Sequence, residues 1–341
     1  MKIVREDELL ALAAGALEGL GMLRNDAVDA ARILVMGDLF GVHTHGVSRL
    51  ESYAERMKAG GSLARPRIRI ERVAPTLARL DGDRGVGPLV GMRALEEAMA
   101  MARELGTGIV FARNSNHFGA IGPYNYLAAQ QGFASIIGSN SSTTIAPHGG
   151  RDARVGNSPL GFGVPRPGGR PIILDMAVSV VARAKIRDAL KAGQPIPDTW
   201  ATDREGRPTT DPQAALDGFL LPIGGYKGYG LALIVDLFAG LLSGAAYLTH
   251  VQTWVDAPAT PQDLGHFFFL IDAGKLGSSA WLAERMDDFA QILHSTPPAD
   301  ATKTILLPGE IEMDKLERHR RDGVAIEEGM LEKLAGYARG A

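Results

Sequence analysis

The sequence predicts an α/β protein in which a mixed-sheet domain is joined to a helical domain built from both termini. Three observations predict this fold class. Apolar residues recur at helical spacing up to about residue 65 and again after residue 314. Between these stretches, short β-branched and aromatic runs alternate with loops and helical segments. Because chain ends often meet in a folded domain, we expect residues 1–70 and 300–341 to form the helical domain and residues 71–299 the α/β domain.

The first part of the chain is expected to be helical and then to change to strands. Gly60 and Gly61 end the helical part, and Gly82–Gly85 form a turn after the first two strands. The expected helices are 6–20, 25–40, 48–59 and 92–105, and the expected strands are 68–73, 75–80 and 108–112. Glu6, Asp7 and Glu8 exclude a secretory signal, which needs a basic start before its apolar core.

The second part continues the alternation. A polar loop with four prolines is expected at 193–216, and a glycine-rich segment at 224–230 opens an apolar helix. That helix contains Asp236 near mid-span, where a charge in hydrocarbon is costly, so we expect it to be buried in protein and not in a membrane. The other expected strands are 133–140, 160–165, 171–175 and 266–272, and the other helices are 177–192, 279–293 and 314–337.

Composition narrows the classes of function. The chain has 341 residues, enough for about two domains, with 45% hydrophobic and 22% charged residues, as in ordinary globular proteins. A net charge of −3 argues against nucleic acid as a partner. The chain contains no cysteine, which excludes disulfides, cysteine-ligated zinc and a thiol nucleophile, and which fits a reducing compartment such as the cytoplasm.

The segment 41–50 is the strongest candidate for chemistry, because it carries two imidazoles, a hydroxyl and a guanidinium between glycines. If a helix begins near Gly46, His45 and Arg49 lie one turn apart on one face. An ionisable imidazole beside a forked cation suits a small substrate with a carboxylate next to an oxygen that gains or loses a proton. Two other interpretations stay open: His43 and His45 as metal ligands, or as histidines with structural hydrogen bonds only.

Three further segments are candidate ligand contacts. The loop 114–119 contains His117 and directly follows a buried strand, where ligands of α/β proteins gather. Segment 85–91 has Val90 where the dinucleotide fingerprint needs glycine, and the next strand ends without a carboxylate, so a turn and helix start is the better interpretation. Segment 224–230 lacks the second half of a P-loop, although its amides and Lys227 could still meet an anion.

Taken together, six stretches resemble the malate/L-lactate dehydrogenase family, which also holds ureidoglycolate, sulfolactate and diketogulonate oxidoreductases and cyclic ketimine reductases. The stretches are GDLFGVHTHGVSRL, RNSNHFGAIGPYNYLA, GNSPLGFGVP, ILDMAVSVVARAKI, LPIGGYKGYGLALIVDLFAGLLSGA and LPGE, in this order over residues 37–310. The resemblance implies a cytoplasmic NAD- or NADP-dependent oxidoreductase with a fold distinct from Rossmann. It also implies a homodimer in which the α/β domain binds cofactor and substrate and the active site lies between domains and near the subunit interface.

The resemblance also implies roles for individual residues. His45 matches the proton donor of the family, Thr44 its hydroxyl partner, and Arg49 the ligand of the substrate carboxylate. His117 matches an acid/base residue of the ureidoglycolate branch, so which histidine dominates stays open. The implied substrate contacts also include Asn157, Arg183 and Lys185. The implied cofactor contacts are His117, Phe118, Gly119, Ala120, Ile121, Asp175, Met176, Ala177, Tyr226, Lys227, Gly228, Pro308, Gly309 and Glu310.

Two departures from the family pattern bear on the substrate. Thr44 stands where serine is usual, and the hydroxyl is kept. Lys185 stands where ketimine reductases carry an aspartate in a proton relay, and a cation cannot take that part. The leading hypothesis is therefore hydride transfer between a nicotinamide and a small 2-oxo or 2-hydroxy acid, without a metal. A cyclic ketimine reductase is the alternative, and a metal-dependent hydrolase or a non-catalytic binding protein are more remote ones.

Overall fold

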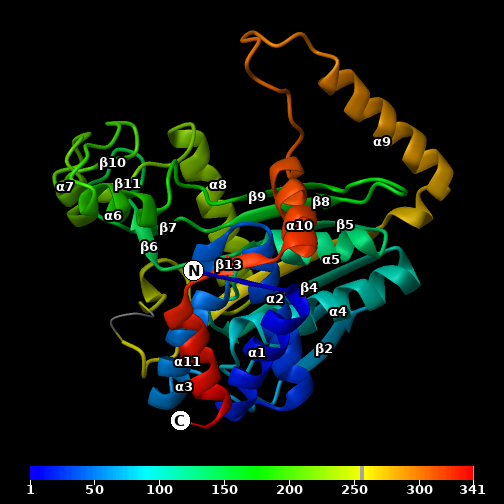
Figure 1. Ribbon diagram of the computed structural model, residues 1–341, viewed down its shortest axis with the longest axis horizontal. Helices are drawn as coiled ribbons and strands as arrows, with labels where there is room; N and C mark the ends of the chain where they lie inside the picture. The colour runs from blue at the N-terminus through cyan, green and yellow to red at the C-terminus, as the bar shows by residue number, and fades with distance from the viewer. Residues whose placement is uncertain (254–256, 341) are drawn as a thin grey trace.

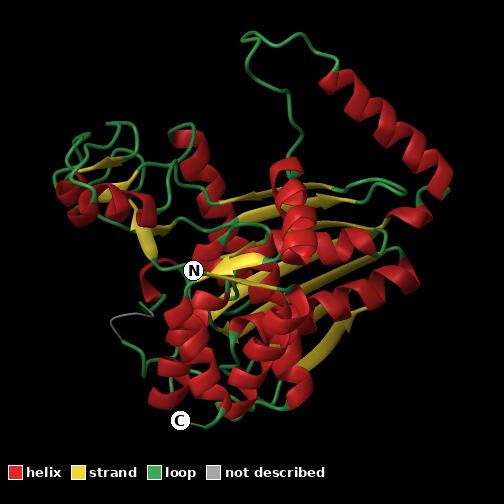
Figure 2. Ribbon diagram, viewed as in Figure 1, coloured by secondary structure: helices red, strands yellow, loops and turns green. Residues whose placement is uncertain are grey.

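A seven-stranded mixed sheet lies at the centre of the computed structural model, which describes residues 1–253 and 257–340 (Figure 1 and Figure 2). Its strand order is β2-β3-β4-β12-β5-β8-β9; β3 and β4 are parallel, and all other neighbours are antiparallel. The strands are β2 (Arg69–Ala74), β3 (Leu77–Asp81), β4 (Thr107–Ser115), β5 (Phe133–Ser139), β8 (Leu160–Val164), β9 (Ile172–Met176) and β12 (Leu264–Asp272). This arrangement confirms the mixed-sheet α/β class and differs from the parallel doubly wound sheet of a Rossmann fold.

Helices cover the two faces of this sheet differently. Helices α4 (Gly87–Leu105) and α5 (Gly122–Gln130) pack on one face, against residues such as Val110 and Phe268. On the other face, α8 (Tyr226–Asp236) continues into the π-helical turn η3 (Leu237–Leu242), whose Phe238 packs against Phe111, Phe267 and Phe269. Val235, Asp236 and Ala239 are buried, but Ile234, Leu237, Leu241 and Leu242 are at least 43% exposed. Only one side of this apolar segment therefore faces the core, and the expected burial of the whole helix is wrong. In the described part of the chain, no helix has the length and apolar character needed to cross a membrane.

The two ends of the chain pack together beside α4. Strand β1 (Lys2–Val4) pairs antiparallel with β13 (Val324–Ile326), and α1 packs on both α2 and α11. The helices here are α1 (Glu6–Gly19), α2 (Arg24–Leu39), α3 (Leu50–Ala59), α10 (Glu310–Asp322) and α11 (Glu328–Ala338). The expected single helix over 314–337 is wrong, because Gly323, at φ 89°, lies between α10 and α11. The domain boundaries near 70 and 300 stay predictions.

A small lobe with its own apolar core projects from the sheet (Figure 1). It contains the four-stranded sheet β10-β11-β6-β7 and two short helices. Their bounds are β6 (Thr143–Ile145), β7 (Val155–Gly156), β10 (Ala201–Thr202), β11 (Phe219–Leu220), α6 (Arg183–Lys191) and α7 (Pro212–Asp217). Two expectations fail here. Helix α6 begins at Arg183 and not at 177, because Val180 N donates to Leu221 O; and the loop 193–216 contains β10 and the start of α7, which Asp211 caps.

Helix α9 (Ser279–His294) and the segment after it extend away from the body of the molecule (Figure 1). Only Met286 and Ala290 of this helix are buried. Trp281, Phe289 and Ile292 are 42%, 51% and 61% exposed. An isolated arm with large apolar side chains in solvent is unusual for a chain that acts alone.

Candidate active site

The segment with the two imidazoles forms two 3₁₀ turns, η1 (His43–His45) and η2 (Val47–Arg49), between α2 and α3. Gly46 is the extended N-cap residue of η2, and η2 runs directly into α3, so the helical backbone begins after Gly46 as expected, with His45 just outside it. His45 and Arg49 are neighbours. The Nε atom of Arg49 donates to the carbonyl oxygen of Thr44, and the charge of Arg49 acts on the His45 ring.

His45 is oriented through one of its two nitrogens. Its Nδ1 lies 3.0 Å from Oγ1 of Thr44, and its ring centroid lies 5.3 Å from that of His117. Burial, and secondarily the charge of Arg49, lowers the pKa of His45 to about 4, so the ring is neutral near pH 7. Among the described residues, none forms a hydrogen bond with Nε2 of His45, so this nitrogen is open to a ligand.

His117 lies in the loop between β4 and α5, and its ring is next to that of His45. Its Nδ1 is 2.8 Å from the hydroxyl oxygen of Tyr53, and its backbone N–H donates to Oε1 of Gln262 at 3.3 Å. Burial first, then the charges of His45 and Arg49, lowers the pKa of His117 well below its usual range. The structure therefore brings together Thr44, His45, Arg49 and His117, as the sequence predicted.

Tyr53 is a member of this cluster that the sequence interpretation assigned only to the apolar face of a helix. It is 4% exposed, and burial raises the pKa of its hydroxyl, so it stays protonated. A protonated phenol can donate to the unprotonated Nδ1 of His117. The signal that could have found it is its spacing, four residues after Arg49, which places both on one helical face.

The positive charge at this site comes from two elements. Burial lowers the pKa of Arg49, and the charge of Arg187 on α6 lowers it further. Tyr53 acts in the opposite direction. Two neighbouring guanidinium groups and two neutral imidazoles favour a small anion.

The predicted substrate contacts outside 44–49 lie on or beside α6. Arg183 donates to the carbonyl oxygen of Leu216, and Lys185 is exposed on the same helix. Asn157 lies on the segment after β7, where its Nδ2 is 3.3 Å from Oγ of Ser179. No direct contact joins these three side chains to His45 in the described part of the structure, so their substrate role stays a prediction.

Two of the predicted cofactor segments meet at the start of α5. Oδ2 of Asp175, at the end of β9, accepts a hydrogen bond of 2.7 Å from the backbone N–H of Gly122. This contact joins Asp175–Ala177 to the loop 117–121. The side chain of Phe118 is buried against His266, with ring centroids 4.2 Å apart, and Ile121 is fully buried. These two residues can therefore reach a ligand only through their backbone.

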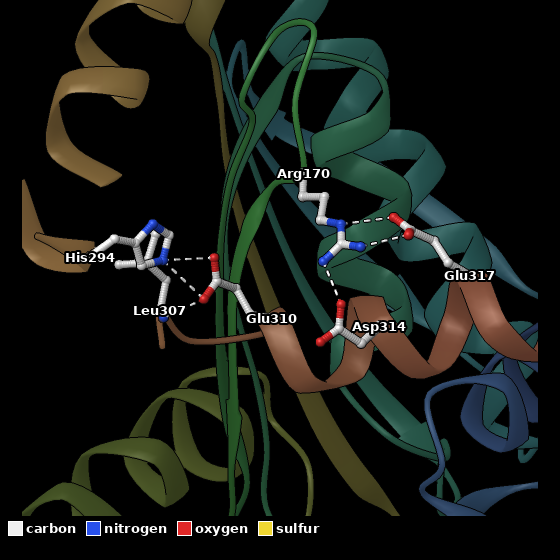
Figure 3. Close-up of polar contacts among 6 residues, drawn as sticks. All are labelled: Arg170, His294, Leu307, Glu310, Asp314 and Glu317. Carbon is white, nitrogen blue, oxygen red and sulfur yellow. Dashed lines mark hydrogen bonds and ion pairs between the residues drawn. The ribbon is translucent and has the colours of Figure 1, made fainter. Parts of the chain in front are cut away.

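The segment Pro308–Glu310 joins the same group of elements from the other side of β9. The backbone N–H of Ile173 donates to Pro308 O at 3.1 Å, and the Glu310 carboxylate accepts from Nε2 of His294 and the backbone N–H of Leu307 (Figure 3). Nearby, Arg170 holds α10 through Asp314 at 2.6 Å and Glu317 at 2.8 and 2.5 Å (Figure 3). The Glu310 carboxylate thus fixes its own loop.

The glycine-rich start of α8 presents its backbone to open space. Gly224 and Gly225 have φ angles of 58° and 63°, and a Cβ at either position would meet no atom within 4 Å. Tyr226 and Lys227 follow, both exposed, at the N-terminus of α8. A cavity of about 630 Å³ lies beside the two glycines in the small lobe, bordered by His148 and Leu221, and does not reach His45.

His43 and His45 are near each other in the sequence, as two metal ligands could be. In residues 1–253 and 257–340, no three or more His, Cys, Asp or Glu side chains are grouped so that they could hold a metal ion. His43 instead pairs with Asp38, its Nδ1 lying 2.9 Å from Oδ1. The two histidines of the His-Thr-His motif therefore have separate surroundings.

Comparison with known sequences gives one family over nearly the whole chain. The profile of the family described as malate/L-lactate dehydrogenase matches residues 4–335. The chain is 35% identical over 344 residues to malate dehydrogenase of Pyrococcus horikoshii, covering 98% of this chain and 94% of that protein. It is 34% identical over 335 residues to (2R)-3-sulfolactate dehydrogenase (NADP(+)) of Chromohalobacter salexigens (98% and 97%), and 33% identical over 338 residues to ureidoglycolate dehydrogenase (NAD(+)) of Escherichia coli (99% and 96%).

Comparison with solved structures agrees. Sulfolactate dehydrogenase of Methanocaldococcus jannaschii superposes with a TM-score of 0.91 at 33% identity, covering 99% of this chain and 97% of that one. Delta1-piperideine-2-carboxylate reductase of Pseudomonas syringae superposes with a TM-score of 0.88 at 29% identity, covering 99% and 100%. The fold described above is therefore shared with proteins whose names include both hydroxy-acid dehydrogenases and an imine reductase.

Proposed function

Because the chain belongs to the malate/L-lactate dehydrogenase family, we propose that it transfers a hydride between NAD or NADP and a small 2-oxo or 2-hydroxy carboxylic acid. The observation that carries this proposal is the pairing of His45, a neutral imidazole with one open nitrogen, with the guanidinium of Arg49. One group handles a proton and the other holds an acid, which are the two tasks that hydride transfer to a 2-oxo acid leaves to the protein.

The segments assigned to the cofactor fit a dinucleotide. Loop 117–121 and Asp175–Ala177 are joined at Gly122, and Pro308–Glu310 adjoins β9. The exposed backbone of Gly224 and Gly225, followed by Lys227 at the start of α8, suits an anionic phosphate group. A bound nicotinamide would supply or accept the hydride. The names of the relatives include both NAD(+) and NADP(+), so both cofactors belong in the test.

The chain's own residues would divide the remaining work. Arg49 binds the substrate carboxylate and so fixes the reacting carbon. Thr44 orients the imidazole of His45 through Nδ1, and His45 exchanges the proton of the substrate oxygen through Nε2. His117, held by Tyr53 and with its ring centroid 5.3 Å from that of His45, would either polarise that oxygen or share the proton.

Before substrate binds, the low pKa of His45 favours oxidation of a 2-hydroxy acid over reduction of a 2-oxo acid. A ring that is neutral down to about pH 4 is ready to accept a proton from a 2-hydroxy acid. For reduction of a 2-oxo acid, the ring must first be protonated. A carboxylate bound at Arg49 offsets the charge that lowers the pKa of His45, and so raises that pKa.

A cyclic ketimine reductase is the second candidate. The similarity to a delta1-piperideine-2-carboxylate reductase over 99% of this chain favours it. Lys185 opposes it, because this position carries the aspartate of a proton relay in the reductases that the sequence resembles. A substrate test must therefore include an imine.

We also propose a cytoplasmic homodimer. Ile136, Phe162 and Leu174 are direct cross-strand partners on β5, β8 and β9, and all three are at least 36% exposed. This apolar row and the apolar side chains of the α9 arm are surfaces that a second copy could cover. Sedimentation should then give twice the 36.2 kDa of one chain. The lack of cysteine fits a reducing compartment.

A substrate panel tests the function directly. Pyruvate, oxaloacetate, sulfopyruvate and piperideine-2-carboxylate would each be incubated with NADH and with NADPH, and absorbance at 340 nm would be followed. We expect turnover of at least one 2-oxo acid. Turnover of the imine alone would replace the proposal with its alternative, and no turnover with either cofactor would contradict both.

The variant Arg49→Ala tests the carboxylate grip. Loss of a charge-assisted hydrogen bond of about 1.5–3 kcal/mol should raise KM for the acid roughly 10- to 100-fold. Because the cofactor contacts are elsewhere, the Kd of NADH, measured by nicotinamide fluorescence, should stay close to the wild-type value. An unchanged KM would remove Arg49 from the substrate site.

A further inference from the structure

A buried carboxylate lies directly beneath the catalytic loop and has no part in the reaction described above. Asp38 is in the last turn of α2 and is 2% exposed. The loop 43–49 follows at once. A carboxylate in such a place is costly unless hydrogen bonds compensate for the lost water.

The two oxygens of Asp38 hold the loop at two points. Oδ1 lies 2.9 Å from Nδ1 of His43, and Oδ2 accepts a 2.7 Å hydrogen bond from the backbone N–H of Val47. These two partners lie on either side of Thr44 and His45. The segment that carries both reactive side chains is therefore fastened at both ends to one carboxylate.

Close packing completes this attachment. A Cβ on Gly46 would come within 2.3 Å of the Asp38 carboxylate atoms, so the loop backbone rests directly on them. A Cβ on Gly37 would lie 2.9 Å from the carbonyl oxygen of His45. Both glycines are needed for the loop to lie this near to α2.

The electrostatic surroundings agree with this arrangement. Burial raises the pKa of Asp38, while the hydrogen bonds from His43 and Val47 lower it and oppose that effect. The hydrogen bond to Asp38 raises the pKa of His43, and the charge of Lys315 lowers it. His319 of α10 is another nearby titratable group, with its ring 6.4 Å from that of His43, and Met1 and Glu327 border the same cavity as Asp38 and His43.

We propose that Asp38 is a positioning residue, whose carboxylate fixes the loop 43–49 so that the imidazole of His45 faces His117. The inference rests on the proposed function, since His45 must exchange a proton for its position to matter. Catalysis depends steeply on such geometry, and a displacement of about 1 Å can cost roughly 100-fold in rate.

The variant Asp38→Asn tests the proposal against a matched control, Asp29→Asn. Asp29 is on the same helix and binds Nη1 of Arg93 at 2.8 Å, so its change removes a comparable hydrogen bond away from the loop. We expect Asp38→Asn to lower kcat about 10- to 100-fold, with the Kd of NADH unchanged. Asp29→Asn should lower the thermal midpoint while kcat stays at the wild-type level.

A second readout needs no activity. In the wild type, the NMR signal of the His45 ring, identified by its absence in His45→Gln, should titrate at about pH 4. Release of the loop into solvent should shift this titration toward 6.5 in Asp38→Asn and leave it unchanged in Asp29→Asn. If wild-type protein turns over no substrate, the proposed function fails, while this titration still decides the role of Asp38.

His43→Ala covers the case in which Asp38→Asn does not fold. The side chain of His43 is 54% exposed, and its loss removes only one of the two attachments. We expect a decrease in kcat and a shift of the His45 titration, both smaller than those expected for Asp38→Asn. Unchanged kcat and an unchanged His45 titration in the variants that fold would overturn the proposal.

Discussion

His45 and His266 are both shielded histidines with a lowered pKa, but their surroundings differ in one decisive respect. In His266, on β12, both ring nitrogens are used: Nδ1 lies 2.9 Å from Oγ of Ser139, and Nε2 lies 2.8 Å from Oγ of Ser115. Its ring also stacks on Phe118. In His45, only Nδ1 has a hydrogen bond among the described residues, and the ring faces a cation and a second imidazole.

This difference separates a histidine with a structural role, His266, from one that can take part in a reaction, His45. Burial lowers the pKa of His266 to about 3 and that of His45 to about 4, so the direction of the shift does not distinguish the two residues. What distinguishes them is an open nitrogen next to a group that can hold a substrate. A perturbed pKa identifies an active site only together with such geometry.

The largest effect expected from this comparison is that of His45→Gln on turnover. Loss of a general acid/base should lower kcat roughly 100-fold or more. The fold should change little, because the ring makes one side-chain hydrogen bond. Steady-state kinetics and circular dichroism measure the two quantities.

A kcat near the wild-type value would assign the proton transfer to His117. His45 would then differ from His266 in its hydrogen bonds but not in its role. The same measurements on His117→Gln would then show the larger loss. Equal losses in both variants would indicate that the two rings act as a pair, with 5.3 Å between their centroids.

His266 should instead affect stability in acid. On lowering the pH, the unfolded chain takes up a proton near 6.5, while the folded protein resists protonation until about 3. The folded state therefore loses stability through this group as the pH falls from about 6.5 toward 3. At pH 5 the loss is about 2 kcal/mol.

The variant His266→Gln should remove this pH dependence. The difference in unfolding free energy between pH 7 and pH 5, from urea denaturation, should shrink by about 2 kcal/mol relative to the wild type. Using the difference cancels the general destabilisation of the variant. An unchanged difference would mean that His266 is protonated at similar pH in both states, which its two hydroxyl partners and complete burial contradict.

The sequence identified His45 and its neighbours because their pattern is local. Two imidazoles, a hydroxyl and a guanidinium within seven positions predict a reactive site, whatever the position of the loop in the fold. Asp38 and Tyr53 lie in the expected helices 25–40 and 48–59, where no sequence pattern gave either of them a role at the site. Their roles depend on contacts with His43 and His117 that only the folded chain brings about.

The α/β class also followed from local periodicity, and the meeting of the termini followed from the general tendency of chain ends to pack together, but the small lobe followed from neither. Its strands have two or three residues each, too few to show an alternating pattern. Residues 177–182 were included in the expected helix 177–192, but they contain three valines and pair with 221–223, through Ser179 and Pro222 among others. The partner of such a long-range pairing cannot be identified from one segment.

The smallest effect in this series is expected for Tyr53→Phe. The change keeps the ring and removes only the hydroxyl that lies 2.8 Å from Nδ1 of His117. Loss of one neutral hydrogen bond of about 1 kcal/mol should lower kcat/KM roughly fivefold.

Tyr126→Phe is the matched control, because its hydroxyl accepts from Nη1 of Arg320 at 3.2 Å and is not in contact with His117. The control should keep the wild-type kcat/KM. Equal kcat/KM values for Tyr53→Phe and Tyr126→Phe would mean that His117 functions without the hydrogen bond from Tyr53. If Tyr53→Phe lowered kcat/KM as much as His45→Gln does, proton transfer would instead depend on the orientation of His117 and not on that of His45.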